Sequence, residues 1–253
     1  MPTIDILLAG MNVNTDQSNL GLATIALIRG RNNILVDVAH CGRRRLLSSA
    51  LASRGLTAED IHMVVLTHAH WDHAQNVDMF PGARFLIHPA ELEYSLSPRK
   101  GDWATPRYFA ATLQGLNVQP VVEGAELEPG VKIIETPGHT RGHISVAVDT
   151  PDGVAIIAGD SFPDAGAVHR GSPYLIFWSK RDAEASVRKI MRLSNVIYPG
   201  HDRPFRITSG GSTTYMEGVT AIKVMAGFEE EDMGVGVTIA LEAIKQPFVH
   251  PEA

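Results

Sequence analysis

The sequence predicts an α+β fold in which two β-sheets pack together and helices lie outside them. Short runs rich in Val and Ile recur along the chain and are bounded by Gly, Pro, Asn or Asp, which is typical of strands. Some runs follow one another through turn sequences, whereas others are separated by helical patterns. This mixture favours two sheets over the strict strand–helix alternation of a doubly wound parallel sheet.

Apolar runs predict the strands, and turn sequences join two pairs of them. "RGRNN" at 29–33 and "DTPDG" at 149–153 carry the Gly, Asn, Asp and Pro residues typical of hairpin turns. The predicted strands are Ile4–Leu8, Ala23–Ile28, Asn33–Asp37, Met63–Leu66, Arg84–Ile87, Val131–Glu135, Ser145–Asp149, Val154–Ala158 and Val196–Tyr198.

Helical patterns separate several of these strands. The segment Arg43–Arg54 lies between two glycines, which suit the ends of a helix. Thr57 followed by Asp60 imitates a capping box with Asp in place of Glu. Two further helices are expected over Pro89–Ser95 and Arg181–Ser194.

Length and composition suit one domain over residues 1–253. The chain is 44% hydrophobic and 20% charged, so it can bury a substantial core, and it shows no internal repeat. A loop is expected at 208–214, "TSGGSTT", within a C-terminal extension at 209–253. The extension either covers a site or makes a homodimer contact, and "EEED" at 229–232 is expected to be a solvated face.

Charge and cysteine content limit the partners and the compartment. The net charge of −6 argues against a general nucleic-acid binder, which needs a basic face, although metal ions can supply positive charge locally. The single cysteine, Cys41, cannot form an intrachain disulfide, so a cytoplasmic location is expected. No run approaches the roughly 18 apolar residues of a membrane span. "MPTIDILLAG" does not resemble a signal peptide.

The stretch "THAHWDHAQN" at 67–76 concentrates potential metal ligands behind a predicted buried strand. It contains His68, His70, Asp72 and His73 on a short loop where their side chains can converge. Imidazole and carboxylate groups suit zinc, and also iron, manganese or nickel. A polar turn facing water would explain one histidine better than three with an aspartate.

Three more candidate ligands follow other predicted strands. "ETPGHTRGH" supplies His139, "IIAGDS" supplies Asp160 and "IYPGHD" supplies His201. Each stands beside a glycine just past a strand, where a loop can bring a side chain close to a metal. The sequence therefore predicts a metal centre assembled from four strand ends.

This order of motifs, HxHxDH followed by His, Asp and His, resembles the metallo-β-lactamase-fold hydrolase superfamily from the N-terminal strands to about Phe205. The resemblance implies an αββα sandwich with the site at the edge between the sheets. It implies two zinc ions per chain, with iron or manganese as alternatives. The implied ligands are His68, His70 and His139 for one metal, Asp72, His73 and His201 for the other, and Asp160 as a bridge.

The same resemblance implies hydrolysis by a hydroxide held between the metals, with Asp160 and Asp72 as catalytic residues. Asp160 would orient the hydroxide, and Asp72 would also pass a proton to the leaving group. The most similar branch contains acyl-homoserine-lactone lactonases, so the expected substrate is a lactone, ester, thioester or β-lactam-type small molecule. Those lactonases carry a tyrosine where Pro163 stands, and Tyr174 is the candidate replacement.

Supporting and substrate-binding residues are less sharply defined. Asp37 matches the family's early structural aspartate, but the family's Asp-Thr-Gly is "DVAHCG" here, which leaves the roles of His40 and Cys41 open. His143 is expected to support the metal ligands. Aromatic residues in loops 97–108 and 162–178 either hold an apolar acyl group or pack the loops. The substrate candidates are Phe162, Tyr174 and Trp178.

Four alternative functions stay open. A phosphodiesterase or nuclease would use the same two metals. A mononuclear iron dioxygenase would not need the second ligand set, and a diiron flavoprotein would need a fused flavin domain. A non-catalytic metal-bound scaffold would be expected to lack a ligand, whereas all seven are present.

Overall fold

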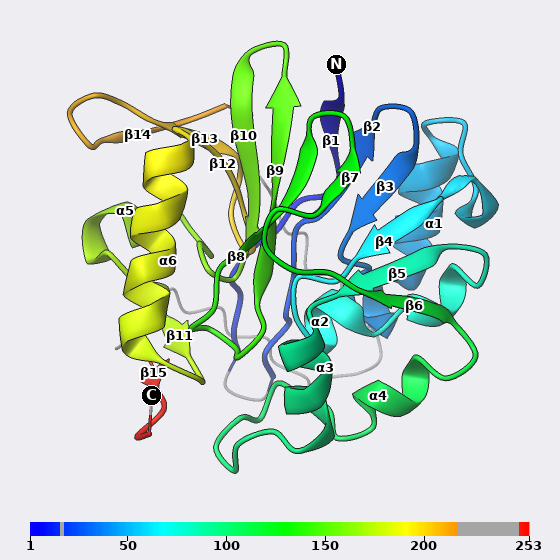
Figure 1. The fold of residues 1–253 in the computed structure, drawn as a ribbon, viewed down its shortest axis with the longest axis horizontal. Coiled ribbons are helices and arrows are strands. Elements are labelled where there is room, and N and C mark those ends of the chain that lie inside the picture. Colours follow the sequence, from blue (N-terminus) through cyan, green and yellow to red (C-terminus); the bar gives the residue numbers. More distant parts are fainter. Residues whose placement is uncertain (16–17, 217–247, 253) are drawn as a thin grey trace, which may run out of the picture.

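Strands from the N-terminal half of the chain form one of two facing β-sheets (Figure 1). The computed structural model describes residues 1–15, 18–216 and 248–252. The first sheet is antiparallel from β1 to β3 and parallel from β3 to β6. In spatial order its strands are β1 (Thr3–Leu8), β2 (Ile25–Arg29), β3 (Asn33–Val36), β4 (Met63–Val65), β5 (Arg84–Ile87) and β6 (Asn117–Pro120).

The second sheet is antiparallel except where β10 and β12 run parallel. In spatial order its strands are β14 (Thr213–Tyr215), β13 (Phe205–Ile207), β12 (Val196–Pro199), β10 (Gly153–Gly159), β9 (Ile144–Thr150), β8 (Val131–Glu135) and β7 (Glu126–Glu128). A small third sheet pairs β11 (Leu175–Ile176) with the C-terminal β15 (Phe248–Val249).

Helices lie on the outer faces of both large sheets (Figure 1). The α-helices are α1 (Arg44–Ala52), α2 (Trp71–Ala74), α3 (Pro89–Leu96), α4 (Phe109–Thr112), α5 (Ala167–Arg170) and α6 (Lys180–Leu193). Short 3₁₀ turns cover Cys41–Arg43, Ala58–Asp60 and Val77–Met79. Helix α1 packs on the first sheet and α6 on the second, so the layers form the predicted αββα sandwich.

The period of two along each strand divides the apolar side chains between layers. In β2, Ala26 and Ile28 point into the space between the sheets, where they join a cluster that includes Val146 of β9. Leu27, between them in sequence, points the other way and packs with Leu47 of α1. Both faces of the central strands are therefore buried, which explains their nearly continuous apolar sequences.

The predicted α+β arrangement, both hairpins and all nine predicted strands are confirmed, with ends shifted by a few residues. Apolar runs in the sequence did not predict β6, β7, β11, β13, β14 and β15, which are short or lie at sheet edges. The predicted helix at 43–54 begins instead as a 3₁₀ turn. The Thr57 signal starts a single 3₁₀ turn, in which Asp60 accepts from the Thr57 N–H at 2.8 Å.

The C-terminal extension is described only in part. Thr213 and Thr214, expected in a loop, belong to β14. The acidic run at 229–232 lies outside the described residues. Within the described ranges, none of the helices has the length and apolar character that crossing a bilayer requires.

A buried carboxylate links the two sheets, and its removal should destabilise the fold. Glu128 of β7 accepts hydrogen bonds from the backbone N–H groups of Arg31 and Asn32, at 3.1 and 2.9 Å, in the β2–β3 turn. We expect Glu128→Ala to lower the free energy of unfolding by about 2–4 kcal/mol, because two backbone N–H groups lose their hydrogen bonds to a charged acceptor. Urea unfolding measures this change.

Glu126→Ala is the matched control, since Glu126 lies on the same strand but is exposed. It should change the free energy of unfolding by less than about 0.5 kcal/mol. Equal losses in the two variants would contradict the assigned role of Glu128.

Candidate metal centre

The end of β4 positions the first group of ligands. The strand is buried along its whole length, and the chain then forms a short loop that carries His68 and His70 before α2 begins. Asp72 and His73 lie within α2, so this single helical turn directs them to a different point from the two loop histidines. All four side chains are buried, which is unusual for polar groups without a ligand.

Three strands of the second sheet deliver the remaining ligands. His139 follows β8, Asp160 comes directly after β10, and His201 follows β12. Since β10 and β12 are parallel, their carboxyl ends meet at the same edge. Gly200 is needed there, because a Cβ at this position would lie 2.1 Å from Oδ1 of Asp160.

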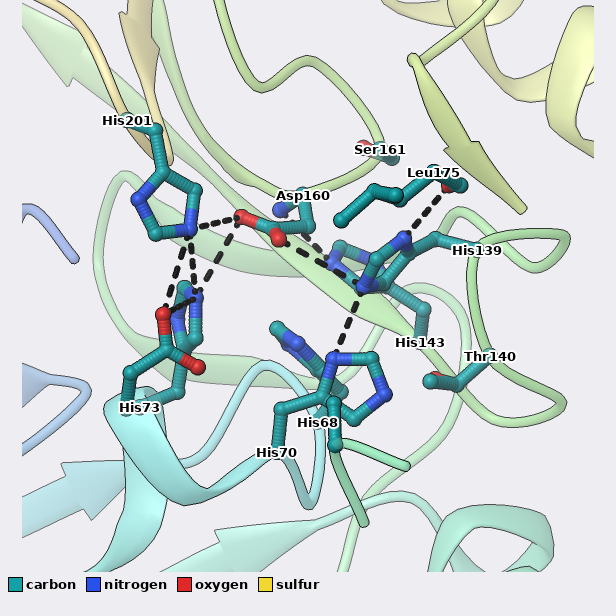
Figure 2. Close-up of polar contacts among 12 residues, drawn as sticks. His68, His70, His73, His139, Thr140, His143, Asp160, Ser161, Leu175 and His201 are labelled. Carbon is teal, nitrogen blue, oxygen red and sulfur yellow. Dashed lines mark hydrogen bonds and ion pairs between the residues drawn. The ribbon is translucent and has the colours of Figure 1, made fainter. Parts of the chain in front are cut away.

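The structure brings the seven predicted ligands together in two groups (Figure 2). Within each group, one potential ligand atom from every residue lies within 4.8 Å of the others. The first group is His68, His70, His139 and Asp160, and the second is Asp72, His73 and His201. Asp160 thus groups with the first three histidines, and the assignment of the two groups to separate metals stays a prediction.

Asp160 lies between the two groups. Its Oδ2 is 3.4 Å from Nε2 of His139, and its Oδ1 is 3.2 Å from Nε2 of His201 and 3.3 Å from Nε2 of His73. Figure 2 shows the carboxylate between these imidazoles. One oxygen is therefore available to each group, which is the arrangement that a bridging ligand requires.

The donor set fits metal ions better than hydrogen bonding among the residues themselves. Nε2 of His68 is buried and has no hydrogen-bond partner. Nε2 of His139 lies only 3.0 Å from Nδ1 of His70. In the second group, the Nε2 atoms of His73 and His201 lie 3.3 Å apart. Imidazole nitrogens and carboxylate oxygens are ligands suited to zinc and neighbouring divalent metals, so the residues present fit a two-metal site.

Asp37 orients two of the histidines from behind. Its Oδ2 is 2.7 Å from Nδ1 of His73 and accepts the hydroxyl of Thr67 at 2.8 Å. Thr67 in turn lies 2.9 Å from Nδ1 of His68. Both rings thus present Nε2 to the site. Asp37 has a φ of 60°, an uncommon left-handed conformation for a non-glycine residue.

Backbone carbonyls and His143 hold the ligands of the second sheet. Nδ1 of His139 is 2.8 Å from the carbonyl oxygen of Leu175, and Nδ1 of His201 is 3.1 Å from that of Leu22. His143 accepts the backbone N–H of Asp160 at 3.1 Å through Nε2. His143 therefore supports Asp160 without belonging to either ligand group.

Burial and nearby carboxylates shift the pKa values of the imidazoles in opposite directions. Burial lowers the pKa of His68 well below its ordinary value and that of His139 to about 4, so both rings stay neutral at pH 7. Burial also lowers the pKa of His73 and His201, but the nearby carboxylates, Asp160 foremost and Asp72 with it, together outweigh burial and raise both pKa values.

A buried glutamate that the sequence analysis missed ties the two ligand loops together. Glu91 of α3 is fully buried, and its Oε1 accepts the N–H of Ala69 at 2.9 Å, between His68 and His70. Its Oε2 accepts the Thr140 hydroxyl at 2.8 Å, beside His139, and the N–H of Gly142 at 2.9 Å. The only sequence signal was its helical spacing with the buried Tyr94.

An open cleft lies over the ligands. Its lining includes Tyr174, Trp71 and Trp103, together with Asp72 and Asp160 of the centre. Three amide side chains, which the sequence analysis did not single out, also line it: Asn12, Asn14 and Asn19. Side chains in this cleft can contact a substrate while it faces the metal ligands.

The other two substrate candidates lie elsewhere. Phe162 is fully buried in the core behind the second sheet and packs against Phe205. Trp178 packs against the Arg99 guanidinium, 4.2 Å from its ring centroid, and against Tyr94. Neither residue contributes to the lining of the cleft.

The remaining sequence candidates have local roles. Trp71 packs edge-on against His40, whose Nδ1 accepts the N–H of Gly42. Cys41 is exposed. His88 caps α3 by accepting the N–H of Ala90 through Nδ1.

Known proteins similar to this chain share one family. The sequence model of the metallo-beta-lactamase superfamily matches residues 17–201. Metallo-beta-lactamase domain-containing protein 1 of Xenopus laevis is 31% identical over 195 residues, which cover 77% of this chain and 76% of that protein. A probable metallo-hydrolase of Methanocaldococcus jannaschii is 27% identical over 169 residues, covering 67% of this chain and 70% of that protein.

Solved structures show the same fold. A putative metallo-beta-lactamase from Thermotoga maritima superposes with a TM-score of 0.66 at 24% identity, covering 81% of this chain and 99% of that one. A mutant of AiiA from B. thuringiensis, with N-decanoyl-L-homoserine bound at its active site, gives a TM-score of 0.62 at 20% identity. That match covers 79% of this chain and 92% of the other.

Removing the Glu91 carboxylate should loosen both ligand loops. We expect Glu91→Ala to lower the free energy of unfolding by about 3 kcal/mol or more, because three buried donors lose their acceptor. The metal content of the purified protein should fall as well, since the loops that carry His70 and His139 are no longer joined. Urea unfolding and elemental analysis measure the two effects.

Glu93→Ala is the control on the same helix. Glu93 is exposed and pairs with Arg141 at 3.0 Å, so its loss should change the free energy of unfolding by less than about 1 kcal/mol. A Glu91→Ala protein with normal stability and a full metal load would contradict the role given to Glu91.

Proposed function

This chain belongs to the metallo-beta-lactamase superfamily and is a metal-dependent hydrolase with a histidine and aspartate metal site, and from that premise we propose its reaction. It uses two zinc ions to hydrolyse a small carbonyl compound of the lactone, ester, thioester or β-lactam type. The observation that supports this most is Asp160, whose two oxygens face separate groups of buried ligands. Two ions held there supply an activated water nucleophile and polarise the substrate carbonyl.

The protein's own carboxylates have distinct parts in this proposal. Asp160 fixes the distance between the two metal sites, because one of its oxygens faces each ligand group. Asp72 lies 3.4 Å from His201 through Oδ2 and also lines the cleft, so it can pass a proton to a leaving group there. Iron or manganese would suit the same ligands, and zinc is the preferred assignment for hydrolysis.

Tyr174 is the proposed hydrogen-bond donor to the substrate carbonyl. Burial, together with the nearby Asp160 and Asp164 carboxylates, raises the pKa of Tyr174 well above its usual value, so its hydroxyl keeps the proton that it donates. Trp71 and Trp103 give the cleft apolar surface, and Asn12 and Asn14 add amide groups. We leave Phe162 and Trp178 out of the proposed binding surface because neither lines the cleft.

The structural neighbour with N-decanoyl-L-homoserine at its active site makes lactones the first substrates to test. A cytoplasmic location is part of the same proposal, supported by a chain with a single cysteine.

A substrate panel tests the reaction class. Zinc-loaded protein should turn over at least one lactone, ester, thioester or β-lactam, and metal analysis of protein purified without added metal should give two zinc per chain. Turnover of a phosphodiester alone would replace the proposal with the nuclease alternative. One iron per chain would point to an oxygenase, and no turnover of any substrate would favour a scaffold.

Ligand variants serve as the controls for this panel. His68→Ala and Asp160→Ala should reduce metal content and lower kcat/KM by more than about 100-fold, since loss of a direct ligand exceeds the loss of an outer partner. His169→Ala removes an exposed histidine and should leave both quantities unchanged. Full activity with a full metal load in either ligand variant would refute the two-metal assignment.

Replacing Tyr174 tests the donor separately from the metals. Tyr174→Phe should lower kcat/KM by about 100-fold while metal content stays normal, because one donor to the developing oxyanion is removed. Tyr108→Phe is the control, since Tyr108 is exposed and its hydroxyl accepts a hydrogen bond from the Gln75 side chain, away from the metal centre. Equal activity of the Tyr174→Phe variant and the parent protein would exclude the hydroxyl from the reaction.

A further inference from the structure

His70 is oriented differently from the other ligand histidines. Its Nδ1 lies 3.0 Å from Nε2 of His139, so Nδ1 faces the ligand group and Nε2 points away from it. That Nε2 is buried and has no hydrogen-bond partner. A metal-bound imidazole normally donates its second N–H to a carboxylate, carbonyl or water, and an unpaired buried N–H is costly.

The group that faces this nitrogen is the carboxylate of Asp102. Its Oδ1 is 3.6 Å from Nε2 of His70, and the Asp102 side chain is wholly buried. Four donors already bind it: the backbone N–H groups of Ala104 and Thr105 bond Oδ1, each at 2.9 Å, and the hydroxyls of Tyr94 and Thr105 bond Oδ2 at 2.7 and 2.8 Å. These four hydrogen bonds hold the Asp102 carboxylate with Oδ1 facing Nε2 of His70.

The loop that carries Asp102 is fixed from behind. The Arg99 guanidinium donates to the carbonyl oxygen of Trp178 and lies over the Trp178 ring. Gly101 packs closely against the His250 ring, since a Cβ at Gly101 would lie 2.7 Å from that ring. Asp102 itself donates its N–H to the Arg99 carbonyl at 2.9 Å. The carboxylate is therefore presented by an anchored segment, which is what a positioning group needs.

We propose that Asp102 is a positioning residue of the metal centre, which accepts the Nε2–H of His70 while Nδ1 of that ring binds the metal. An ordinary hydrogen bond requires the two atoms to approach by about 0.7 Å, a small rotation of either side chain. The bond holds His70 in one tautomer and makes Nδ1 a stronger donor to the metal. The proposal rests on the proposed function only in taking His70 as a metal ligand.

Asp102→Asn in the full-length protein tests this assignment. The amide oxygen can keep the bonds from Ala104 and Thr105, and the hydroxyls of Tyr94 and Thr105 can rotate to accept from the amide nitrogen. The substitution therefore removes the charge and leaves the packing. We expect one of the two metals to bind about 10-fold to 100-fold more weakly in competition with a chromophoric chelator, and the other to be unaffected.

Cobalt(II) reports on the ligand geometry independently of activity. The visible spectrum of the cobalt-loaded Asp102→Asn protein should differ from that of the parent, while thermal unfolding of the two metal-free proteins should coincide. Asp78→Asn is the matched control, because Asp78 is an exposed aspartate paired with Arg44. It should leave both metal affinities and the spectrum unchanged.

Unchanged affinities and spectrum in a folded Asp102→Asn protein would overturn the proposal. If that variant does not fold, Tyr94→Phe takes its place, since it removes one donor to Asp102 and keeps the charge. Tyr94→Phe should lower the affinity for the same metal by a smaller factor and shift the cobalt spectrum. A metal affinity and a spectrum equal to those of the parent protein would overturn the proposal equally. Metal binding is measured without substrate, so failure of the hydrolase proposal would show in the substrate panel alone.

Discussion

The carboxylate of Asp160 lies where ligands from both sheets converge, and the arrangement of the centre depends on it. It follows β10 directly, so the period of two along the strand decides on which side its side chain emerges. Gly200 leaves the space that the carboxylate fills, and His143 accepts its backbone N–H. With its position set in this way, the same side chain faces His139 with one oxygen and His201 with the other. The spacing of the two ligand groups therefore depends on where the end of β10 places Asp160.

Buried acids outside the two ligand groups connect segments that are distant in sequence. Asp37 joins the ends of β3 and β4, Glu91 joins the loops after β4 and β8, and Glu128 joins the second sheet to the β2–β3 turn. Each of these carboxylates accepts at least two hydrogen bonds, and such charge-assisted bonds offset the cost of removing a charge from water. The ligand loops are therefore held by hydrogen bonds as well as by any metal, and a centre of this kind is partly organised before metal binds.

Individual strands show why pattern analysis succeeded in the interior and failed at the edges. Met63–Val65 is buried on both faces, so its apolar sequence identifies it without any knowledge of its neighbours. Asn117–Pro120 is mostly exposed and contains two polar residues and a proline; it is a strand because β5 offers an unpaired edge beside it. Phe248–Val249 likewise depends on pairing with Leu175–Ile176, some 70 residues earlier. Edge strands take their conformation from a partner strand, and pairing with a partner leaves no alternation of apolar and polar residues in the local sequence.

The sequence alone determined the chemistry of the centre, and the tertiary structure decided how that chemistry is supported and reached. Ligand type and position after a strand are local properties, so His68, Asp160 and their companions could be chosen from short motifs. Asp102 faces His70 across 32 residues of chain, and Phe162 turns into the core although it follows Asp160 by two. No motif encodes such contacts, because hydrogen bonds and packing between distant loops arise only once the sheets have assembled. The candidate metal ligands were therefore accessible from sequence, whereas the supporting carboxylates and the walls of the cleft required the fold.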